Sequence, residues 1–196
     1  MPRRAREDRR RGVRVALRKR KRARPPAVTI GLPAAVLRAG LETRMDESMQ
    51  RKIVGLLDAH RVMRIATLRP DGWPQVTTVG YVNEGLALWF LCGPDSQKAR
   101  NLACDARVSL AIDHDTPDIL AITGLSMAAR ARRVDDPAEA ERIVRALPSK
   151  YPDDPPAVAE MEMPAARDLA VFRVEPQVIS VLDYRLGFGH ADLVRM

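Results

Sequence analysis

The stretch that decides the fold is residues 62–92, which read VMRIATLRPDGWPQVTTVGYVNEGLALWFLC. It contains three β-prone runs of similar length, which are Val62 to Leu68, Trp73 to Val82 and Leu86 to Cys92. The two connections, Pro70-Asp71-Gly72 and Asn83-Glu84-Gly85, have the composition of tight turns with positive φ angles. The pattern therefore predicts an antiparallel meander rather than alternating strands and helices.

Helices and further strands are predicted on both sides of this stretch. Upstream, Met49, Ile53 and Leu57 recur at helical spacing behind Asp46, whose carboxylate favours a helix start. Downstream, the predicted elements are a helix over Ser96–Cys104, a strand over Arg107–Asp113, a long strand over Ile119–Val134 with a bend or bulge at Gly124, a helix over Pro137–Leu147 capped by Asp136, and one or two strands over Leu169–Val174 and Gln177–Tyr184, interrupted at Pro176. Six or seven antiparallel strands with two or three peripheral helices predict a mainly β domain, folded as a closed or partly closed barrel.

Charge divides the chain into two parts. Residues 1–24 hold 13 Lys and Arg against two acidic residues, whereas residues 25–196 hold 20 basic and 23 acidic residues. The first part predicts a disordered basic arm, which is either a solvated tail or a contact for nucleic acid. Met45 is an alternative start of translation. Residues 25–45, which are rich in proline and glycine, predict a linker, and residues 46–196 form the predicted domain.

The bulk composition excludes several classes of protein. The longest apolar run is about seven residues, far short of a membrane span. No apolar segment follows the basic N-terminus, so we expect a cytoplasmic protein without a membrane partner. Two cysteines cannot supply a disulfide framework, and three histidines provide poorly for a zinc site, so no metal is expected. The chain also lacks the G-x-S-x-G, P-loop and G-x-G-x-x-G motifs.

Two segments have the residue types of a cofactor site. Ser96, Gln97 and Lys98 stand where a turn enters a helix, so that free N–H groups, a hydroxyl and an ammonium face an anion such as phosphate. The alternative is that Ser96 only caps the helix and Lys98 is solvated. In the strand upstream, Thr77 and Val79 alternate with Thr78 and Gly80. Its amides and hydroxyls suit the polar edge of a planar heterocycle, for which Gly80 leaves space; the alternative is an ordinary β-branched strand.

The run from Arg64 to Asp113 resembles the pyridoxamine 5'-phosphate oxidase-like family of flavin-binding split barrels. The motifs that carry the resemblance are RIATL, DGWPQV, TTVGY, LWF, SQKARNL and ARVSLAID. The resemblance implies a homodimeric split barrel with flavin or deazaflavin at the subunit interface. It also implies that Ser96 and Lys98 bind the cofactor's phosphate and that Thr77, Thr78 and Val79 lie along the ring.

Two features depart from the oxidase that gives the family its name. The matching motif of that oxidase resembles Ser-Arg-Lys, whereas this chain has Gln97 in place of the arginine. One guanidinium that would pair with the phosphate is therefore missing. The oxidase's substrate-phosphate signature is also absent from the C-terminal third. The resemblance therefore implies an FMN-dependent oxidoreductase acting on an unidentified small molecule, with no catalytic residue assigned. A deazaflavin-dependent reductase and a non-catalytic flavin or haem carrier or sensor are the alternatives.

The C-terminal residues are a further candidate for the pocket. Tyr184, Arg185, Phe188 and His190 resemble the tails of uncharacterised members of the broader family. Three roles are open for these residues: lining the pocket, reaching the partner subunit, or docking the C-terminal segment onto the domain.

Overall fold

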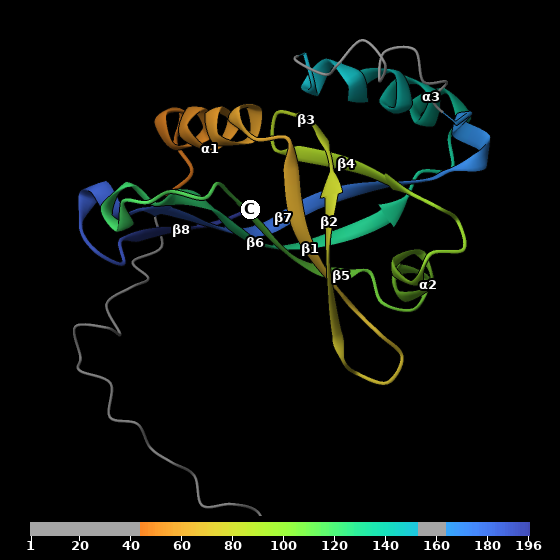
Figure 1. Ribbon diagram of the computed structural model, residues 1–196, viewed down its shortest axis with the longest axis horizontal. Coiled ribbons are helices and arrows are strands. Elements are labelled where there is room, and N and C mark those ends of the chain that lie inside the picture. The colour runs from red at the N-terminus through yellow and green to blue at the C-terminus, as the bar shows by residue number, and fades with distance from the viewer. Residues whose placement is uncertain (1–43, 153–163) are drawn as a thin grey trace, which may run out of the picture. The chain divides into compact units, whose positions relative to one another are not determined.

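A computed structural model of the protein describes residues 44–152 and 164–196 (Figure 1). The predicted basic arm of residues 1–24 lies outside the described residues. The same is true of the predicted linker, except for Arg44 and Met45. The predictions for these two segments therefore remain predictions.

Within the described ranges the chain forms three α-helices and eight strands. The helices are α1 (Glu47–Ala59), α2 (Gln97–Cys104) and α3 (Pro137–Ala146). The strands are β1 (Val62–Leu68), β2 (Pro74–Gly80), β3 (Val82–Glu84), β4 (Ala87–Cys92), β5 (Arg107–Asp113), β6 (Thr123–Arg133), β7 (Ala170–Asp183) and β8 (Ala191–Arg195). Short 3-10 turns, among them η2 (Ile119–Ala121), η3 (Leu147–Lys150) and η5 (Tyr184–Leu186), connect them.

All strand pairs are antiparallel, and they form one sheet in the order β2-β1-β5-β6-β7-β4-β3, with β8 added to β7. β2 and β4 contact each other although no ladder joins them, because the sheet curves into a half-barrel (Figure 1). Buried side chains from the strands, among them Ile65, Phe90 and Ile179, fill the barrel together with Ile53 and Leu57 of α1. The mainly β barrel predicted from the sequence is confirmed.

The predicted strand over residues 73–82 is wrong in one respect, because the chain breaks at Tyr81. β2 pairs with β1, whereas β3 pairs with β4, so the meander is interrupted between them. Tyr81 is fully buried, and its hydroxyl donates to the Leu57 carbonyl oxygen at 2.7 Å. Burial raises the pKa of this phenol, which therefore stays protonated as a donor. The break thus anchors the end of β2 to α1.

The long β6–β7 ladder differs from the prediction at both of its special residues. The register shift lies between Ala128 and Ala129, where β7 carries Pro176, and not at Gly124. Proline has no N–H to donate to a ladder, so a bulge is the arrangement that lets β7 continue through it. Gly124 is needed for another reason: a Cβ there would lie 2.7 Å from the Ile112 carbonyl oxygen.

The structure also differs from the prediction at the start of β6 and at the C-terminus, where it adds a strand. β6 begins only at Thr123, because Asp118 caps the short η2 turn before it. β8 was not predicted at all: residues 191–195 return along β7 after a turn that contains Gly187 and Gly189, both at positive φ.

Among the described residues, no helix combines the length and apolar character needed to cross a membrane.

Candidate functional site

The alternation of β2 divides the predicted ring-binding residues between two faces. Thr77 and Val79 are turned toward the interior together with Gln75, whereas Thr78 and Val76 are exposed. The Thr77 hydroxyl oxygen is buried and has no hydrogen-bond partner among the described residues. A buried hydroxyl without a partner is unfavourable, so it is a specific position at which a ligand atom would be stabilised.

The start of α2 presents Ser96 and Lys98 as the sequence predicts. Ser96 is the N-cap, and its hydroxyl oxygen accepts from the Ala99 N–H at 3.3 Å. Ser96 therefore caps the helix, as the alternative interpretation of the sequence predicts, although its hydroxyl proton stays available for a second interaction. Lys98 is half-buried, and its ammonium makes no hydrogen bond or ion pair with any described residue. An ammonium without a partner beside a helix start is suited to an anionic ligand.

Asn101 joins these two segments. Its side chain is fully buried, and its amide donates to Thr67 Oγ1 of β1 at 3.0 Å and to Gln75 Oε1 of β2 at 3.2 Å. Its carbonyl oxygen accepts from Gln97 Nε2 at 2.8 Å. Because Gln75 and Thr77 share a face of β2, this network holds the start of α2 against the strand face that carries the unpartnered hydroxyl. The sequence analysis did not single out Asn101.

Arg100 brings a guanidinium to the start of α2. Its side chain turns back along the helix and donates to the Asp95 carbonyl oxygen and, across 3.1 Å, to Gln97 Oε1. Gln97 therefore uses both ends of its amide, one toward Asn101 and one toward Arg100. A guanidinium is thus present one turn after Gln97 in the same helix, where it is bonded to Asp95 and Gln97.

The space predicted at Gly80 is not available to a heterocycle. A Cβ at this position would lie 2.6 Å from the Tyr151 hydroxyl oxygen, so Tyr151 fills the space beside the strand. The same hydroxyl donates to the Arg61 carbonyl oxygen at 3.0 Å. The sequence interpretation of Gly80 is therefore wrong: the glycine makes room for a side chain of the protein.

Lys150, next to Tyr151, has a structural role in the same region. Its ammonium donates to the carbonyl oxygens of Leu57 at 2.8 Å and His60 at 3.3 Å, at the C-terminal end of α1. It also lies 4.8 Å from the centre of the Tyr81 ring. Burial lowers the pKa of this ammonium, and its position at the negative end of a helix favours the charged form.

The C-terminal candidates contact each other and α1. Arg185 makes two hydrogen bonds to the buried carboxylate of Asp183, at 2.8 and 2.9 Å, and Lys52 of α1 approaches the same carboxylate at 3.0 Å. The rings of Tyr184 and Phe188 contact each other in a tilted arrangement, with their centres 5.5 Å apart, and His190 Nε2 lies 3.4 Å from the Asp192 carboxylate. The structure thus favours a docking role for this segment.

A comparison with protein-family models matches most of the chain to a known family. Residues 49–183 match the family described as pyridoxamine 5'-phosphate oxidase. The chain belongs to this family. No curated protein matches the chain. The match spans β1 to β7, so both segments of the candidate site lie within it.

Solved structures of this oxidase-like group have the same fold. A conserved hypothetical protein from Mycobacterium tuberculosis is 27% identical with a TM-score of 0.59, covering 74% of this chain and 90% of that one. An F420 reductase is 26% identical with a TM-score of 0.52, covering 64% of this chain and 94% of that one. A haem-binding protein from Mycobacterium smegmatis is 24% identical with a TM-score of 0.54, covering 74% of this chain and 56% of that one.

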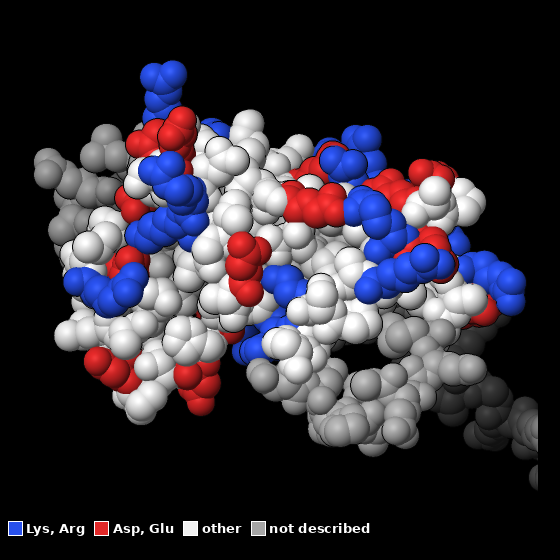
Figure 2. All heavy atoms as spheres, turned by 90° about the horizontal axis from the view of Figure 1, so that it is seen from above, with Lys and Arg blue, Asp and Glu red and all other residues white. Residues whose placement is uncertain are grey.

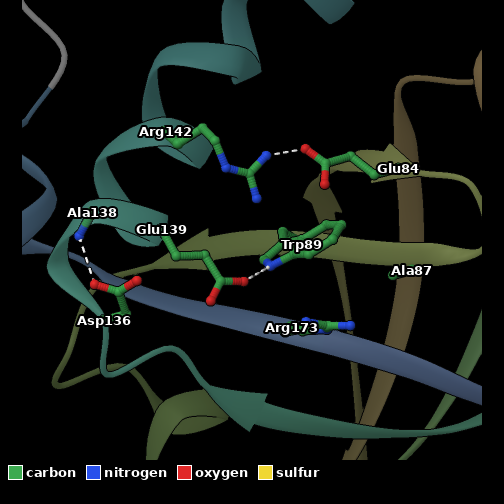
Figure 3. Close-up of a pocket in the computed structure, with 8 residues that line it drawn as sticks. All are labelled: Glu84, Ala87, Trp89, Asp136, Ala138, Glu139, Arg142 and Arg173. Atoms are coloured by element: carbon green, nitrogen blue, oxygen red, sulfur yellow. Dashed lines mark hydrogen bonds and ion pairs between the residues drawn. The ribbon is translucent and has the colours of Figure 1, made fainter.

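One cavity lies beside α2, and another lies beside α3, away from the predicted site residues. One of about 490 Å³ lies between α2 and the end of β6 and is lined in part by Arg100, Arg132 and Arg133. The other, of about 530 Å³, lies under α3, where Glu139 accepts from the Trp89 indole N–H at 2.8 Å and Arg142 pairs with Glu84 (Figure 3). Its polar groups already satisfy one another, and it contains none of the predicted site residues.

The chemistry of the site residues fits a flavin-class cofactor with a phosphate. Ser96 offers a hydroxyl proton, Lys98 an unpartnered ammonium and Thr77 a buried oxygen without a hydrogen bond. Thr78 is on the opposite face of β2 and does not join this set through its side chain. Among the residues that the structure describes, no three His, Cys, Asp or Glu side chains are grouped so as to hold a metal ion.

Proposed function

We propose that this member of the family is an oxidoreductase that binds FMN, with the phosphate at the start of α2 and the ring along β2. The observation that carries the proposal is the half-buried ammonium of Lys98, which has no partner among the described residues, beside the capped start of α2. Charge-assisted hydrogen bonds to phosphate are about twice as strong as neutral ones, so Lys98 would contribute more to the affinity than a neutral donor such as the Ser96 hydroxyl.

Each residue of the site has a separate task in this proposal. Ser96 would donate its hydroxyl proton to the phosphate, and Arg100 would provide a second positive charge from the same helix. Thr77 would make a hydrogen bond to the ring from the interior face of β2. When bound, FMN supplies hydride or electron transfer to a small molecule, while the protein orients the ring and excludes water. No acid or base of the protein is then required.

A deazaflavin is the second candidate cofactor. The similarity to an F420 reductase, at 26% identity over most of that protein, supports it. Deazaflavin and FMN both have a phosphate and a tricyclic ring, so Ser96, Lys98 and Thr77 would serve either one. The haem-binding relative, at 24% identity, supports the fold alone, and haem enters only as a third compound to be tested.

We also propose that the site is completed by a second copy of the chain. β2 is an edge strand of the sheet, and apolar side chains lie exposed on and before it: Trp73 is 72% exposed and Val76 is 64% exposed. An unpaired edge with exposed apolar side chains is typical of a surface that another chain covers. Association through this edge would place β2, with Val76 and Thr78 on its exposed face, at a subunit interface. On the face that Figure 2 shows, acidic and basic side chains are intermixed.

Native mass spectrometry of the full chain as purified tests both proposals together. The expected spectrum contains a dimer that carries one FMN, or one F420, per chain. A Trp73→Lys variant should shift the dimer toward monomer, because it places a charge on the apolar edge, whereas Phe188→Lys, at an exposed aromatic residue elsewhere, should not. A monomer that takes up neither compound after incubation with excess FMN or F420 would contradict the proposal.

A further inference from the structure

Two histidines lie side by side at a place that the proposed cofactor site does not use. His60 follows the last residue of α1, and His114 follows the last residue of β5. β1 and β5 are paired, with Arg64 opposite Ala111, so the start of β1 and the end of β5 lie at the same edge of the ladder. This register brings together two imidazoles that are 54 residues apart in the sequence.

The proton of His60 can be placed from its hydrogen bond. His60 Nδ1 lies 2.7 Å from the Leu56 carbonyl oxygen, which can only accept, so Nδ1 carries the proton and donates it. The neutral ring then has its lone pair on Nε2. A hydrogen bond from one ring nitrogen to a backbone carbonyl is the usual arrangement that orients a histidine whose other nitrogen binds a metal.

The other ring nitrogen of His60, Nε2, is in hydrogen-bond contact with His114, and the length of this contact matches the separation of two ligands in tetrahedral coordination. His60 Nε2 and His114 Nδ1 are 3.3 Å apart. With zinc–nitrogen bonds of about 2.0–2.1 Å, two ligands of one tetrahedral ion lie about 3.3 Å apart. Two neighbouring ligands of a square-planar ion with similar bond lengths would lie closer, at about 2.9 Å. The separation therefore favours Zn²⁺ over a square-planar ion.

We propose that His60 and His114 form a binding site for Zn²⁺. His60 binds through Nε2 and His114 through Nδ1, whose proton moves to its Nε2 when the metal displaces the contact between the rings. His114 is exposed and His60 is half-buried, so the ion enters from solvent, and water occupies the remaining positions. No third His, Cys, Asp or Glu of the described residues completes the site, which makes the ion exchangeable.

The experiment is a calorimetric titration of the untagged full chain with ZnCl₂ in the absence of chelators. The expected result for the wild type is saturable binding of one ion per chain, reversed by EDTA. Losing a group that merely orients a ligand already costs about tenfold or more in metal affinity, so His114→Ala should cost at least that. His190→Ala, which removes the third histidine from a different turn, is the matched control and should leave the affinity unchanged.

A second measurement separates binding at this site from binding elsewhere. Zn²⁺ should raise the melting temperature of the wild type and of His190→Ala, but not that of His114→Ala. Because His114 is exposed, the His114→Ala variant should fold normally. Absence of saturable binding to the wild type at millimolar Zn²⁺ would overturn the proposal, and so would equal affinity of His114→Ala and the wild type.

Discussion

The Asn101 side-chain amide donates to Gln75 Oε1 across 3.2 Å, and this bond links α2 to the interior face of β2. Thr77, two residues further along the same face, has the buried hydroxyl that lacks a partner. One buried side chain thus keeps the start of α2 and the strand that would hold a ring at a fixed separation. Both parts of the candidate site depend on Asn101, although it is not itself exposed to a ligand.

Asn101→Leu should lower the free energy of unfolding by about 1–3 kcal/mol, because Thr67, Gln75 and Gln97 lose their common partner in a buried place. Urea unfolding at neutral pH measures the change. Gln97→Leu removes only one of these bonds at a half-buried position, so it should cost less. Equal stability of Asn101→Leu and the wild type would show that the network is dispensable.

Arg100→Gln should weaken FMN binding by about tenfold, since it removes a charged donor from the start of α2. Its effect on the unfolding free energy should be small, because its own bonds to Asp95 and Gln97 are exposed. Arg145→Gln, in the exposed pair with Glu141 on α3, removes the same charge elsewhere and is the control. If both variants bound FMN equally well, Arg100 would have no part in the site.

Gly80→Ala should destabilise the protein by about 0.5–1.5 kcal/mol, because the new Cβ displaces the Tyr151 hydroxyl from the Arg61 carbonyl oxygen. In a Tyr151→Phe background the same change should cost clearly less, since the clashing atom is gone. A double-mutant cycle in urea measures this coupling. Gly55→Ala, where a Cβ meets nothing within 4 Å, should instead stabilise α1 by about 0.5–1 kcal/mol. Additive effects at positions 80 and 151 would contradict the contact.

The ion pairs of Asp183 predict a specific dependence of stability on pH. Hydrogen bonds from Arg185, together with Lys52, hold the pKa of the Asp183 carboxyl well below its usual range. A lowered native pKa adds stability above the unfolded pKa of about 3.9, and this stability is lost as the pH falls through the native value.

Asp183→Asn should therefore cost about 1.5–3 kcal/mol at pH 7 and should flatten the loss of stability below about pH 5. Urea unfolding between neutral and acidic pH checks both effects. Asp71→Asn, in an exposed pair with Arg69, should leave the pH profile close to that of the wild type. A profile of Asp183→Asn parallel to that of the wild type would be inconsistent with the depressed pKa.

Much of the fold follows from local sequence rules. β1 and β5 have the predicted bounds, and the three α-helices begin directly after Asp46, Ser96 and Asp136, the residues that mark their predicted starts. These features depend on alternation and capping, which act over a few residues. The break at Tyr81 was not predictable in this way, because it depends on a hydrogen bond to α1, 24 residues earlier.

In the candidate site, too, the features set by local sequence were predicted, and those set by partners in other elements were not. Ser96 and Lys98 stand at the start of α2 as predicted, since a turn followed by a cap is a local signal. Asn101, Arg100 and Tyr151 were missed because their roles depend on partners in other elements or on how a side chain turns back along its helix. Gly80 was misread for the same reason: a glycine in a strand indicates a close approach, but the sequence does not name the neighbour.

The most direct test of the proposed cofactor site is a fluorescence titration of FMN, and in parallel of F420, with the wild type and Lys98→Gln. We predict saturable binding of at least one of the two compounds to the wild type, with one site per chain. Lys98→Gln should weaken it by about tenfold or more without changing the unfolding free energy, because Lys98 has no described partner to lose. Binding of neither compound, or equal binding to the two proteins, would contradict the account.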